Sequence, residues 1–366
     1  MSARALTGNF RAIQAQLPAQ ALIPMIKADA YGHGASWAAR ELAGLDGLYA
    51  FGVATLEEGK QVRLALRGSR ARARILVFSG TAPWSDEKGQ FCELHGLTPV
   101  ISTEADWVDF LRGKWPERLS YHLKFNTGMN RLGIPAAYAP QVSRALKAKP
   151  IGWHPEGICS HLAMAEAPEH KLSRLQAERF KQLRGDLEAT LPSAQFHLAN
   201  SSAIWNSKAW GLDSLTDIVR PGISLYGVPP WKGASLRGLA PVMTLLSQVL
   251  TVNILKRGES VGYGATYTVK GPGPESIAIL GAGYADGLHR RLSGTGWLIL
   301  GGRKERLLGR VSMDLSAALC SKSVKAGEYA EILGPGIDIW EQSEVAQTIP
   351  YELLTSVSGR VQKIYV

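Results

Sequence analysis

Short apolar runs recur along the first part of the chain, separated by longer segments whose apolar residues follow helical spacing. Eight such runs occur, at residues 21–27, 48–53, 74–79, 97–101, 120–125, 157–161, 195–197 and 217–220. Runs of this length between helical segments are typical of βα units, and eight successive units form a TIM barrel. Thr55 and Glu58 form a capping box at the start of one intervening helix. We therefore predict an α/β fold with an N-terminal (β/α)8 barrel.

The pattern changes near residue 230, after the sequence Gly-Val-Pro-Pro. Beyond it, alternating polar and apolar positions predict β-strands at residues 247–254, 276–280, 297–300 and 329–333. Turns rich in glycine and proline separate these segments. We predict two domains, a TIM barrel over residues 1–229 and an all-β C-terminal domain over residues 230–366.

The length of 366 residues agrees with two domains and a large core. No apolar run approaches the roughly 18 residues that a membrane span needs, and the first ten residues lack the apolar stretch of a signal peptide. We therefore expect a cytoplasmic protein with no membrane partner. Its three cysteines are far apart, at Cys92, Cys159 and Cys320. This spacing favours buried thiols over a disulfide framework or a metal site.

The formal net charge of +10 raises the question of a nucleic-acid partner. Five arginines cluster in one stretch, at Arg63, Arg67, Arg70, Arg72 and Arg74. A mixed-charge helix leading into a buried strand explains them as a solvated face, and a site for anionic small molecules also favours positive charge. We therefore expect no nucleic acid and a small-molecule substrate.

Polar side chains stand where the predicted barrel strands end, which is where TIM-barrel enzymes carry their chemistry. These residues are Lys27, Lys124, His161, Asn200, Ser201 and Arg220. Lys27 ends an apolar run, so burial is expected to lower its pKa and favour the neutral amine that attacks aldehydes. The alternative is an ordinary strand-end lysine whose charge reaches solvent.

Several longer motifs resemble the alanine racemase family. Residues 25–34 read MIKADAYGHG, similar to the family's cofactor-lysine signature. In order along the chain follow HLKFNTGMNRLG at 122–133, HLANS at 197–201, RPGISLYG at 220–227, GYGATY at 262–267, GYADG at 283–287, GRVSMD at 309–314 and PYE at 350–352. The resemblance therefore covers nearly the whole chain.

The resemblance implies a pyridoxal 5'-phosphate (PLP) enzyme of fold type III: a barrel that holds the cofactor, a β domain, and a head-to-tail homodimer. Lys27 is expected to form the Schiff base with the cofactor, and Arg220 to face its pyridine nitrogen. The other implied cofactor-binding residues are Tyr31, Asn200, Ser201, Gly222, Ile223 and Tyr351. Because a guanidinium stays protonated, Arg220 would leave that nitrogen unprotonated and the ring a weaker electron sink.

The resemblance also implies interconversion of L-alanine and D-alanine through an external aldimine, for peptidoglycan supply or for alanine catabolism. Racemisation needs a base on each face of a planar α-carbon, and the implied bases are Lys27 and Tyr263, the latter from the partner subunit. A phenol is a weak base at neutral pH. His161 and Arg220 are therefore expected to support Tyr263.

Further roles follow from the same resemblance. Arg131 and the backbone amide of Met313 are expected to bind the substrate carboxylate. Lys124 corresponds to a lysine that many relatives carry in carbamylated form, although Asn126 replaces the aspartate often found two residues later. Three residues are expected to line the access path, namely Tyr284, Arg290 and Arg310.

Other readings share part of this pattern. A decarboxylase of the same cofactor class is disfavoured by Tyr263, and a broad-specificity racemase by the lack of an export signal. A serine racemase is harder to separate, although Tyr351 points to a small methyl side chain. A non-catalytic PLP-binding barrel protein would lack the β domain. Relatives also open with a strand before the first helix, and few residues precede that helix here, so we expect a less covered edge on the β domain.

Overall fold

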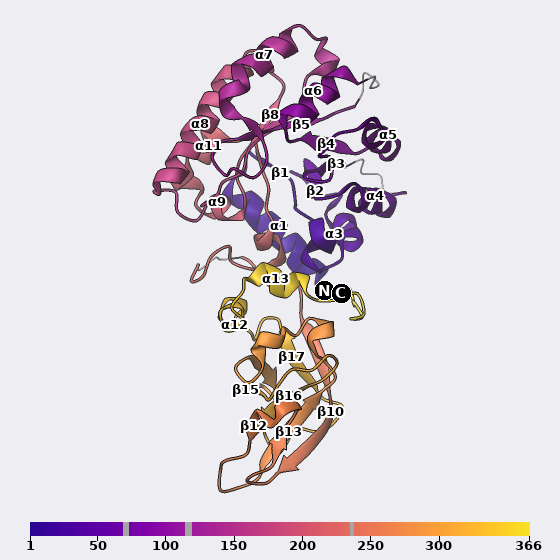
Figure 1. Ribbon diagram of the computed structural model, residues 1–366, viewed down its shortest axis with the longest axis vertical. Coiled ribbons are helices and arrows are strands. Elements are labelled where there is room, and N and C mark those ends of the chain that lie inside the picture. The colour runs from indigo at the N-terminus through magenta and orange to yellow at the C-terminus, as the bar shows by residue number, and fades with distance from the viewer. Residues whose placement is uncertain (69–72, 114–118, 235–237) are drawn as a thin grey trace.

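The computed structural model describes residues 1–68, 73–113, 119–234 and 238–366. Figure 1 shows two bodies one above the other, with the barrel at the top and the β-rich part at the bottom. The chain ends lie side by side between them, next to α13.

Apart from the two-residue β6 (Ile134–Pro135), which pairs with β5, the described part of the upper body contains eight parallel strands. They are β1 (Ala21–Leu22), β2 (Ala50–Val53), β3 (Arg74–Val77), β4 (Thr98–Ile101), β5 (His122–Asn126), β7 (Gly157–Cys159), β8 (Gln195–His197) and β9 (Ile218–Val219). Parallel pairing runs in the order β2-β3-β4-β5-β7-β8, and β1 pairs with β9. Single bridges from Leu22 to Leu48 and from Asn200 to Arg220 join the two sheets. The strands therefore close into the predicted barrel, which is confirmed.

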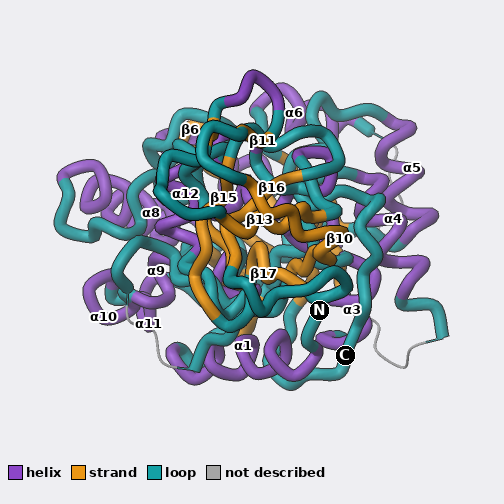
Figure 2. The backbone as a smooth tube through the Cα atoms, turned by 90° about the horizontal axis from the view of Figure 1, so that it is seen from below, coloured by secondary structure: helices purple, strands orange, loops and turns teal. Residues whose placement is uncertain are grey.

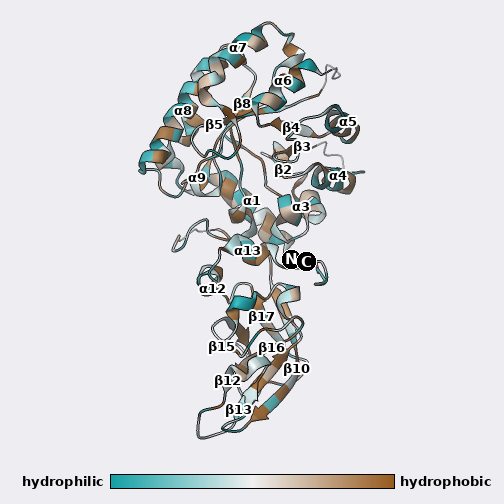
Figure 3. Ribbon diagram, viewed as in Figure 1, coloured by the Kyte–Doolittle hydropathy of each residue, from teal (hydrophilic) through white to brown (hydrophobic). Residues whose placement is uncertain are grey.

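Helices cover the outside of these strands. The longer ones are α1 (Ala3–Gln16), α3 (Ala35–Leu42), α4 (Leu56–Ala65), α5 (Asp86–His95), α6 (Glu104–Arg112), α7 (Ala139–Lys147) and α8 (Lys171–Glu188). In Figure 3 the outer helices α7 and α8 carry hydrophilic residues while β8 is hydrophobic, as an amphipathic layer over a core requires. The predicted capping box of Thr55 and Glu58 is present at the start of α4.

The interior of the barrel contains polar groups as well as the usual aliphatic ones. Ile23, Leu76 and Ile218 belong to one buried cluster there. His122 on β5 and His197 on β8 are also fully buried. Branched aliphatic residues usually fill a TIM barrel, so this histidine pair requires its own hydrogen-bond partners.

Antiparallel strands form the lower body, seen end-on in Figure 2. They are β10 (Leu245–Leu255), β13 (Glu275–Leu280), β14 (Trp297–Leu300), β15 (Arg303–Leu308), β16 (Ser316–Cys320) and β17 (Tyr329–Leu333). They close in the order β10-β13-β16-β15-β14-β17. The expectation of a less covered sheet edge is therefore wrong, because closure gives each of these strands two neighbours.

The end of the chain returns to the upper body. After α12 (Ile339–Val345), the helix α13 (Pro350–Thr355) contacts the turn that follows β1. The last residue, Val366, exchanges backbone hydrogen bonds with Met1 and Ala3. The domain boundary at residue 230 stays a prediction, with the addition that residues 350–366 lie against the barrel.

The structure also shows the state of the cysteines, of the arginine cluster and of the longer helices. Cys92, Cys159 and Cys320 are buried free thiols, as expected. Of the arginine cluster, Arg63 donates to two backbone carbonyls and Arg74 pairs with a glutamate; Arg70 and Arg72 lie outside the described residues. No helix in the described part of the chain has the length and apolar character needed to span a membrane.

Candidate active site

Lys27 begins an unusual turn rather than ending a strand. β1 stops at Leu22, and Lys27 opens the turn α2 (Lys27–Tyr31). The four residues after it, 28–31, have φ between +50° and +56°. Each non-glycine residue in this left-handed conformation costs roughly 1–2 kcal/mol. Strain of this kind persists where the surroundings enforce it, and it concentrates at functional sites.

The surroundings of Lys27 favour its neutral form. Burial lowers the pKa of this amine, and Arg131 lowers it further, while Glu58 opposes the shift. A lower pKa increases the neutral fraction, which is the nucleophilic and basic form. The expected shift is therefore confirmed in direction and in cause.

Glu58 connects this turn to the next βα loop. Its carboxylate accepts hydrogen bonds from the backbone amides of Ala28 and Ala54, each at 2.7 Å, and it also closes the capping box with Thr55. One side chain thus caps α4 and fixes the residue that follows Lys27.

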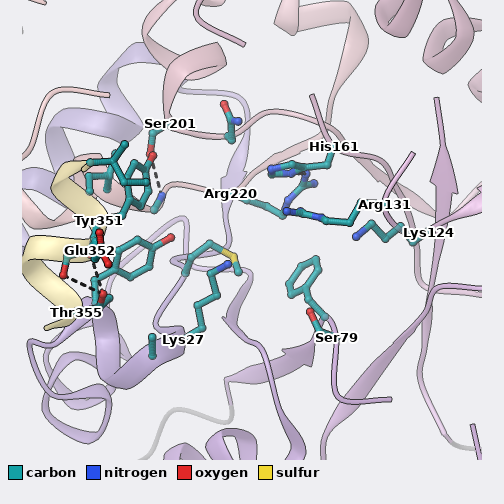
Figure 4. A pocket seen from close by; sticks show the side chains of 18 residues that line it. Lys27, Ser79, Lys124, Arg131, His161, Ser201, Arg220, Tyr351, Glu352 and Thr355 are labelled. Carbon is teal, nitrogen blue, oxygen red and sulfur yellow. Dashed lines mark hydrogen bonds between the residues drawn. The ribbon is translucent and has the colours of Figure 1, made fainter. Parts of the chain in front are cut away.

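One cavity of about 500 Å³ gathers most of the predicted site. The predicted residues that line it are Lys27, Tyr31, Lys124, Arg131, His161, Asn200, Ser201, Arg220, Gly222, Ile223 and Tyr351. Figure 4 shows Lys27 between two groups, with Ser201 and Tyr351 on one side and His161, Arg220 and Arg131 on the other. The motifs that are far apart in sequence therefore meet at one end of the barrel.

The cavity also contains residues that the sequence reasoning missed. Phe78 and Ser79 follow the end of β3, and Ile349 and Thr355 flank Tyr351 in and before α13. Their position just after a barrel strand could have identified Phe78 and Ser79. The resemblance implied that Tyr351 reaches the barrel cavity, but it did not indicate Ile349 and Thr355 beside it.

Ser201, Gly222 and Tyr31 form a narrow cradle on one side of the cavity. The Ser201 hydroxyl accepts from the amide of Gly222 at 2.9 Å. A Cβ on Gly222 would lie 2.6 Å from the Tyr31 hydroxyl oxygen, so a side chain does not fit there. Burial raises the pKa of Tyr31, and it raises that of Tyr351 to about 12. Both phenols therefore keep their protons and can donate hydrogen bonds to an anion.

Arg220 is held rigidly on the other side. Its guanidinium donates to the backbone oxygens of Ser160, His197 and Leu198 at 2.6 to 3.0 Å. It also lies 2.7 Å from Nδ1 of His197 and 3.3 Å from Nδ1 of His161. Arginine offers donors only, so both imidazoles accept at Nδ1.

These contacts fix the protonation of a chain of histidines. His197 accepts at Nδ1 and therefore carries its proton on Nε2, which lies 2.9 Å from Nδ1 of His122. Burial lowers the pKa of His161 and of His197, and Arg220 lowers both further. The three imidazoles are thus neutral, and His161 presents an Nε2–H donor beside the cavity.

Lys124 and Arg131 form a cationic corner of the cavity. Burial lowers the pKa of Lys124, with Arg220, Arg131 and Lys27 adding to the shift. Asn126 brings no charge to this corner. Its Oδ1 accepts hydrogen bonds from backbone amides of the loop that leads to Arg131, including Gly128 at 3.0 Å. Its amide therefore orders the Arg131 loop.

The remaining predicted residues lie elsewhere, in a second cavity of about 500 Å³ in the lower body. These are Tyr263, Tyr284, Arg290, Arg310 and Met313. The Tyr263 side chain is 73% exposed and Met313 is 53% exposed. All residues that line this cavity come from the C-terminal part of the chain. Within one chain the predicted site is thus divided between two cavities.

The comparisons with known proteins agree on one family. The family model described as "Alanine racemase, N-terminal domain" matches residues 1–230, and "Alanine racemase, C-terminal domain" matches residues 242–365. The alanine racemase of Carboxydothermus hydrogenoformans is 35% identical and that of Stutzerimonas stutzeri 36%, with 98% and 99% of this chain covered, and 96% and 97% of theirs.

Solved structures give the same result. The biosynthetic alanine racemase from Pseudomonas aeruginosa matches with a TM-score of 0.87 at 32% identity, over 100% of this chain and 98% of that one. The Bartonella henselae alanine racemase, solved with covalently bound pyridoxal phosphate, matches with a TM-score of 0.86 at 27% identity and the same coverage. By fold and by sequence over nearly its full length, the chain belongs to the alanine racemase family of isomerases.

Proposed function

We propose that this protein interconverts L-alanine and D-alanine, using pyridoxal 5'-phosphate and one base on each face of the substrate. The observation that carries the proposal is the single cavity around Lys27, with an anion cradle on one side and a fixed guanidinium on the other. A two-base reaction also needs a second base, and Tyr263 is the candidate from the second cavity.

The cavity fits this cofactor. The missing side chain at Gly222 leaves space beside the Ser201 and Tyr31 hydroxyls, which suits a phosphate that accepts hydrogen bonds. Ile223, Asn200 and Tyr351 line the same space. When bound, pyridoxal phosphate supplies an aldehyde that a lysine amine captures and a conjugated ring that withdraws electrons from the substrate α-carbon.

Arg220 would set the electronic character of that ring. It donates to three carbonyls and two imidazoles and cannot provide an acid proton at neutral pH. A ring nitrogen facing it would remain unprotonated. A ring with an unprotonated nitrogen would withdraw less electron density than one with an acidic partner. This favours return of the proton to the substrate α-carbon over side reactions.

The chain's own bases would move the proton. Lys27, with its lowered pKa, takes a proton from one face of the α-carbon or returns it. Tyr263 serves the opposite face, and the Nε2–H of His161 can stabilise its phenolate. Arg131 and the backbone amide of Met313 would hold the substrate carboxylate. Tyr284, Arg290 and Arg310, which share the cavity of Tyr263, would line the access path.

These assignments require a homodimer. Lys27 and Tyr263 line different cavities of one chain, so a complete site would combine the barrel of one subunit with the β domain of another. In a twofold-symmetric dimer each β domain would complete the barrel cavity of the other subunit, which gives two equivalent sites per dimer. We place the reaction in the cytoplasm, where D-alanine would serve peptidoglycan synthesis or alanine would be degraded.

Lys124 is the proposed position of a carbamate. Its lowered pKa increases the neutral amine that adds carbon dioxide, with release of one proton. The product would be an anion next to Arg131 and would orient its guanidinium. Intact-mass or peptide-mass measurement under carbon dioxide should show the adduct on Lys124, and an unmodified amine would remove the assignment.

The racemase proposal is tested by isotope exchange. The protein, loaded with pyridoxal phosphate, is incubated with L-alanine in deuterated water, and optical rotation and α-deuterium are followed together. Lys27→Ala should lose both signals by roughly a thousandfold or more and lose the visible absorption of the lysine-bound cofactor. Lys208→Ala, a change of an exposed lysine outside both cavities, is the control.

Tyr263→Phe should give an asymmetric result. Because only one face loses its base, exchange from one enantiomer should persist better than from the other, while the cofactor still binds. Equal exchange from both enantiomers at the wild-type rate would contradict the two-base assignment.

A further inference from the structure

We propose that residues 361–366, here called the C-terminal strap, hold the left-handed turn of residues 28–31 in place and thereby position the amine of Lys27. The catalytic consequence rests on the proposed function, in which Lys27 is a base. The structural part stands on contacts between the strap, the turn and α3.

The turn needs external support. Four consecutive non-glycine residues have φ near +50°, a conformation that L-residues visit as single positions. Its backbone makes local hydrogen bonds: Ala30 donates to Ile26 at 2.9 Å, Gly32 to Ala28 at 3.0 Å and Gly34 to Asp29 at 2.7 Å. These local bonds do not remove the backbone strain of four consecutive left-handed residues, and such strain persists only where the surrounding structure enforces it.

Asp29 is the first point of support. One of its carboxylate oxygens accepts from the amide of Ala35 at 2.7 Å, at the start of α3. The other pairs with the ammonium of Lys363 in the strap. The Lys363 side chain is 17% exposed and that of Asp29 is 46% exposed, so the ammonium is partly buried while the carboxylate reaches solvent. Asp29 thus ties the second residue after Lys27 to the strap.

Tyr365 is the second point of support. Its ring stacks on Trp37 of α3, with centroids 4.8 Å apart and an angle of 23° between planes. Its hydroxyl lies over the backbone of Gly34, where a Cβ would come within 2.3 Å of the oxygen. Gly34 also has φ of +105°. The strap therefore packs against the segment that leads from the turn into α3.

The strap itself is anchored by the other end of the chain. The Met1 ammonium donates to the carbonyl of Ile364 at 2.7 Å. The amide of Val366 donates to Met1 at 2.8 Å, and the amide of Ala3 donates back to Val366 at 2.7 Å. Figure 1 shows the two ends side by side below α3. This pairing fixes Lys363 and Tyr365 in register with the turn.

α13 closes the turn from another side. The carbonyl oxygen of Leu354 lies 2.3 Å from the position that a Cβ on Gly32 would take, so a side chain does not fit there. Tyr351 of the same helix lies 5.9 Å from the Tyr31 ring, centroid to centroid. The turn is thus confined between α13 and the strap, and loss of the strap should loosen it without exposing the barrel core.

Lys363→Gln tests the proposal in the full-length protein. Hydrogen exchange of the amides at 28–35, measured without cofactor, should become at least about threefold faster, the effect of one lost ion pair. Lys363→Arg should keep the wild-type rate. Lys232→Gln breaks another ion pair, with Glu344, and should leave these amides unchanged. Tyr365→Ala removes the stacking contact and should act in the same direction.

A second readout reports on Lys27 itself. Acylation of its amine in cofactor-free protein, followed by peptide mass spectrometry at pH 8, should slow about twofold in Lys363→Gln, as better solvation raises its pKa. In the loaded enzyme, kcat should fall while KM for alanine stays constant. Unchanged hydrogen exchange at 28–35, or an unchanged rate of Lys27 acylation, would contradict the proposed role of the strap. Absence of racemisation in the wild type would instead contradict the proposed function, because neither exchange nor acylation depends on it.

Discussion

At the scale of single residues, the tightest restriction in the cavity is at Gly222. The Tyr31 hydroxyl oxygen lies only 2.6 Å from the position that a Cβ would take there, and Tyr31 is held by ring contacts with Tyr226 and Tyr351. A methyl group at 222 must therefore displace Tyr31 or enter the space proposed for the phosphate.

Gly222→Ala is expected to weaken pyridoxal phosphate binding at least about tenfold, the loss of roughly one charge-assisted hydrogen bond. Fluorescence or absorbance titration with the cofactor measures it. Gly185→Ala is the matched control, because Gly185 lies inside α8 with nothing within 4 Å of its Cβ. That change should leave binding intact and stabilise the protein slightly, as alanine favours helix. Equal cofactor affinity in both variants would argue against the cradle.

Some residues could be predicted because a motif carries them, and others could not. Lys27, Arg220 and Ser201 were identified from motifs at strand ends and meet in one cavity. The left-handed conformation of residues 28–31 was not predictable, since Ala-Asp-Ala-Tyr has no glycine to indicate positive φ. Contacts with Glu58 and Lys363, distant in sequence, impose it.

At the scale of elements, the eight barrel strands were predicted and are present, although several are shorter than their apolar runs. β1 ends at Leu22 and β3 at Val77, while their runs extend to residues 27 and 79. Backbone pairing nevertheless continues past these ends, since Ile23 donates to Val219, Met25 to Pro221 and Phe78 to Val53. In the lower body β15 was missed, since its sequence RKERLL is mostly charged, and its pairing with β14 and β16 makes it a strand.

The buried histidines on the barrel elements should make the fold sensitive to acid. Burial lowers the pKa of His33 to about 4 and that of His122 to about 3, and those of His161 and His197 also fall well below their usual value. In the unfolded chain each would titrate near 6.5. The unfolded state therefore binds more protons as pH falls below 6.5.

The free energy of unfolding should accordingly decrease from pH 6.5 downward, by up to about 1.4 kcal/mol per pH unit for each such histidine. For His33 and His122 the decrease continues to about pH 4 and 3 respectively. Urea unfolding at pH 7, 6 and 5 measures the slope. His122→Gln should reduce it, whereas His170→Gln, at an exposed position, should not. A stability that is constant over this range would contradict neutral buried histidines.

At the scale of the whole molecule, the predicted site is split into two cavities that belong to different bodies of one chain. The sequence motifs predicted the site residues, the predicted domain boundary placed Tyr263 in the β domain, and the resemblance implied a second subunit. Tyr263 and Met313 are large apolar or aromatic side chains that are 73% and 53% exposed, and exposed surface of this kind is typical of a contact with another molecule, in agreement with the proposed second subunit.

Mixed dimers test whether Lys27 and Tyr263 act from different subunits. Lys27→Ala and Tyr263→Phe are each weakly active or inactive alone. If sites are shared, a mixed dimer has one site lacking both bases and one site with both intact. Random exchange makes half of the dimers mixed, so activity should return to about a quarter of the wild-type value. Purified variants are mixed under conditions that allow subunit exchange, and racemisation is followed over time.

The matched control is a mixture of Lys27→Ala with the double variant Lys27→Ala/Tyr263→Phe, which has no intact lysine in any subunit and should remain inactive. If both bases came from one chain, every site in the first mixture would lack a base and no activity would return. Recovery in the first mixture and not in the second would therefore require that the β domain of one subunit completes the barrel cavity of the other.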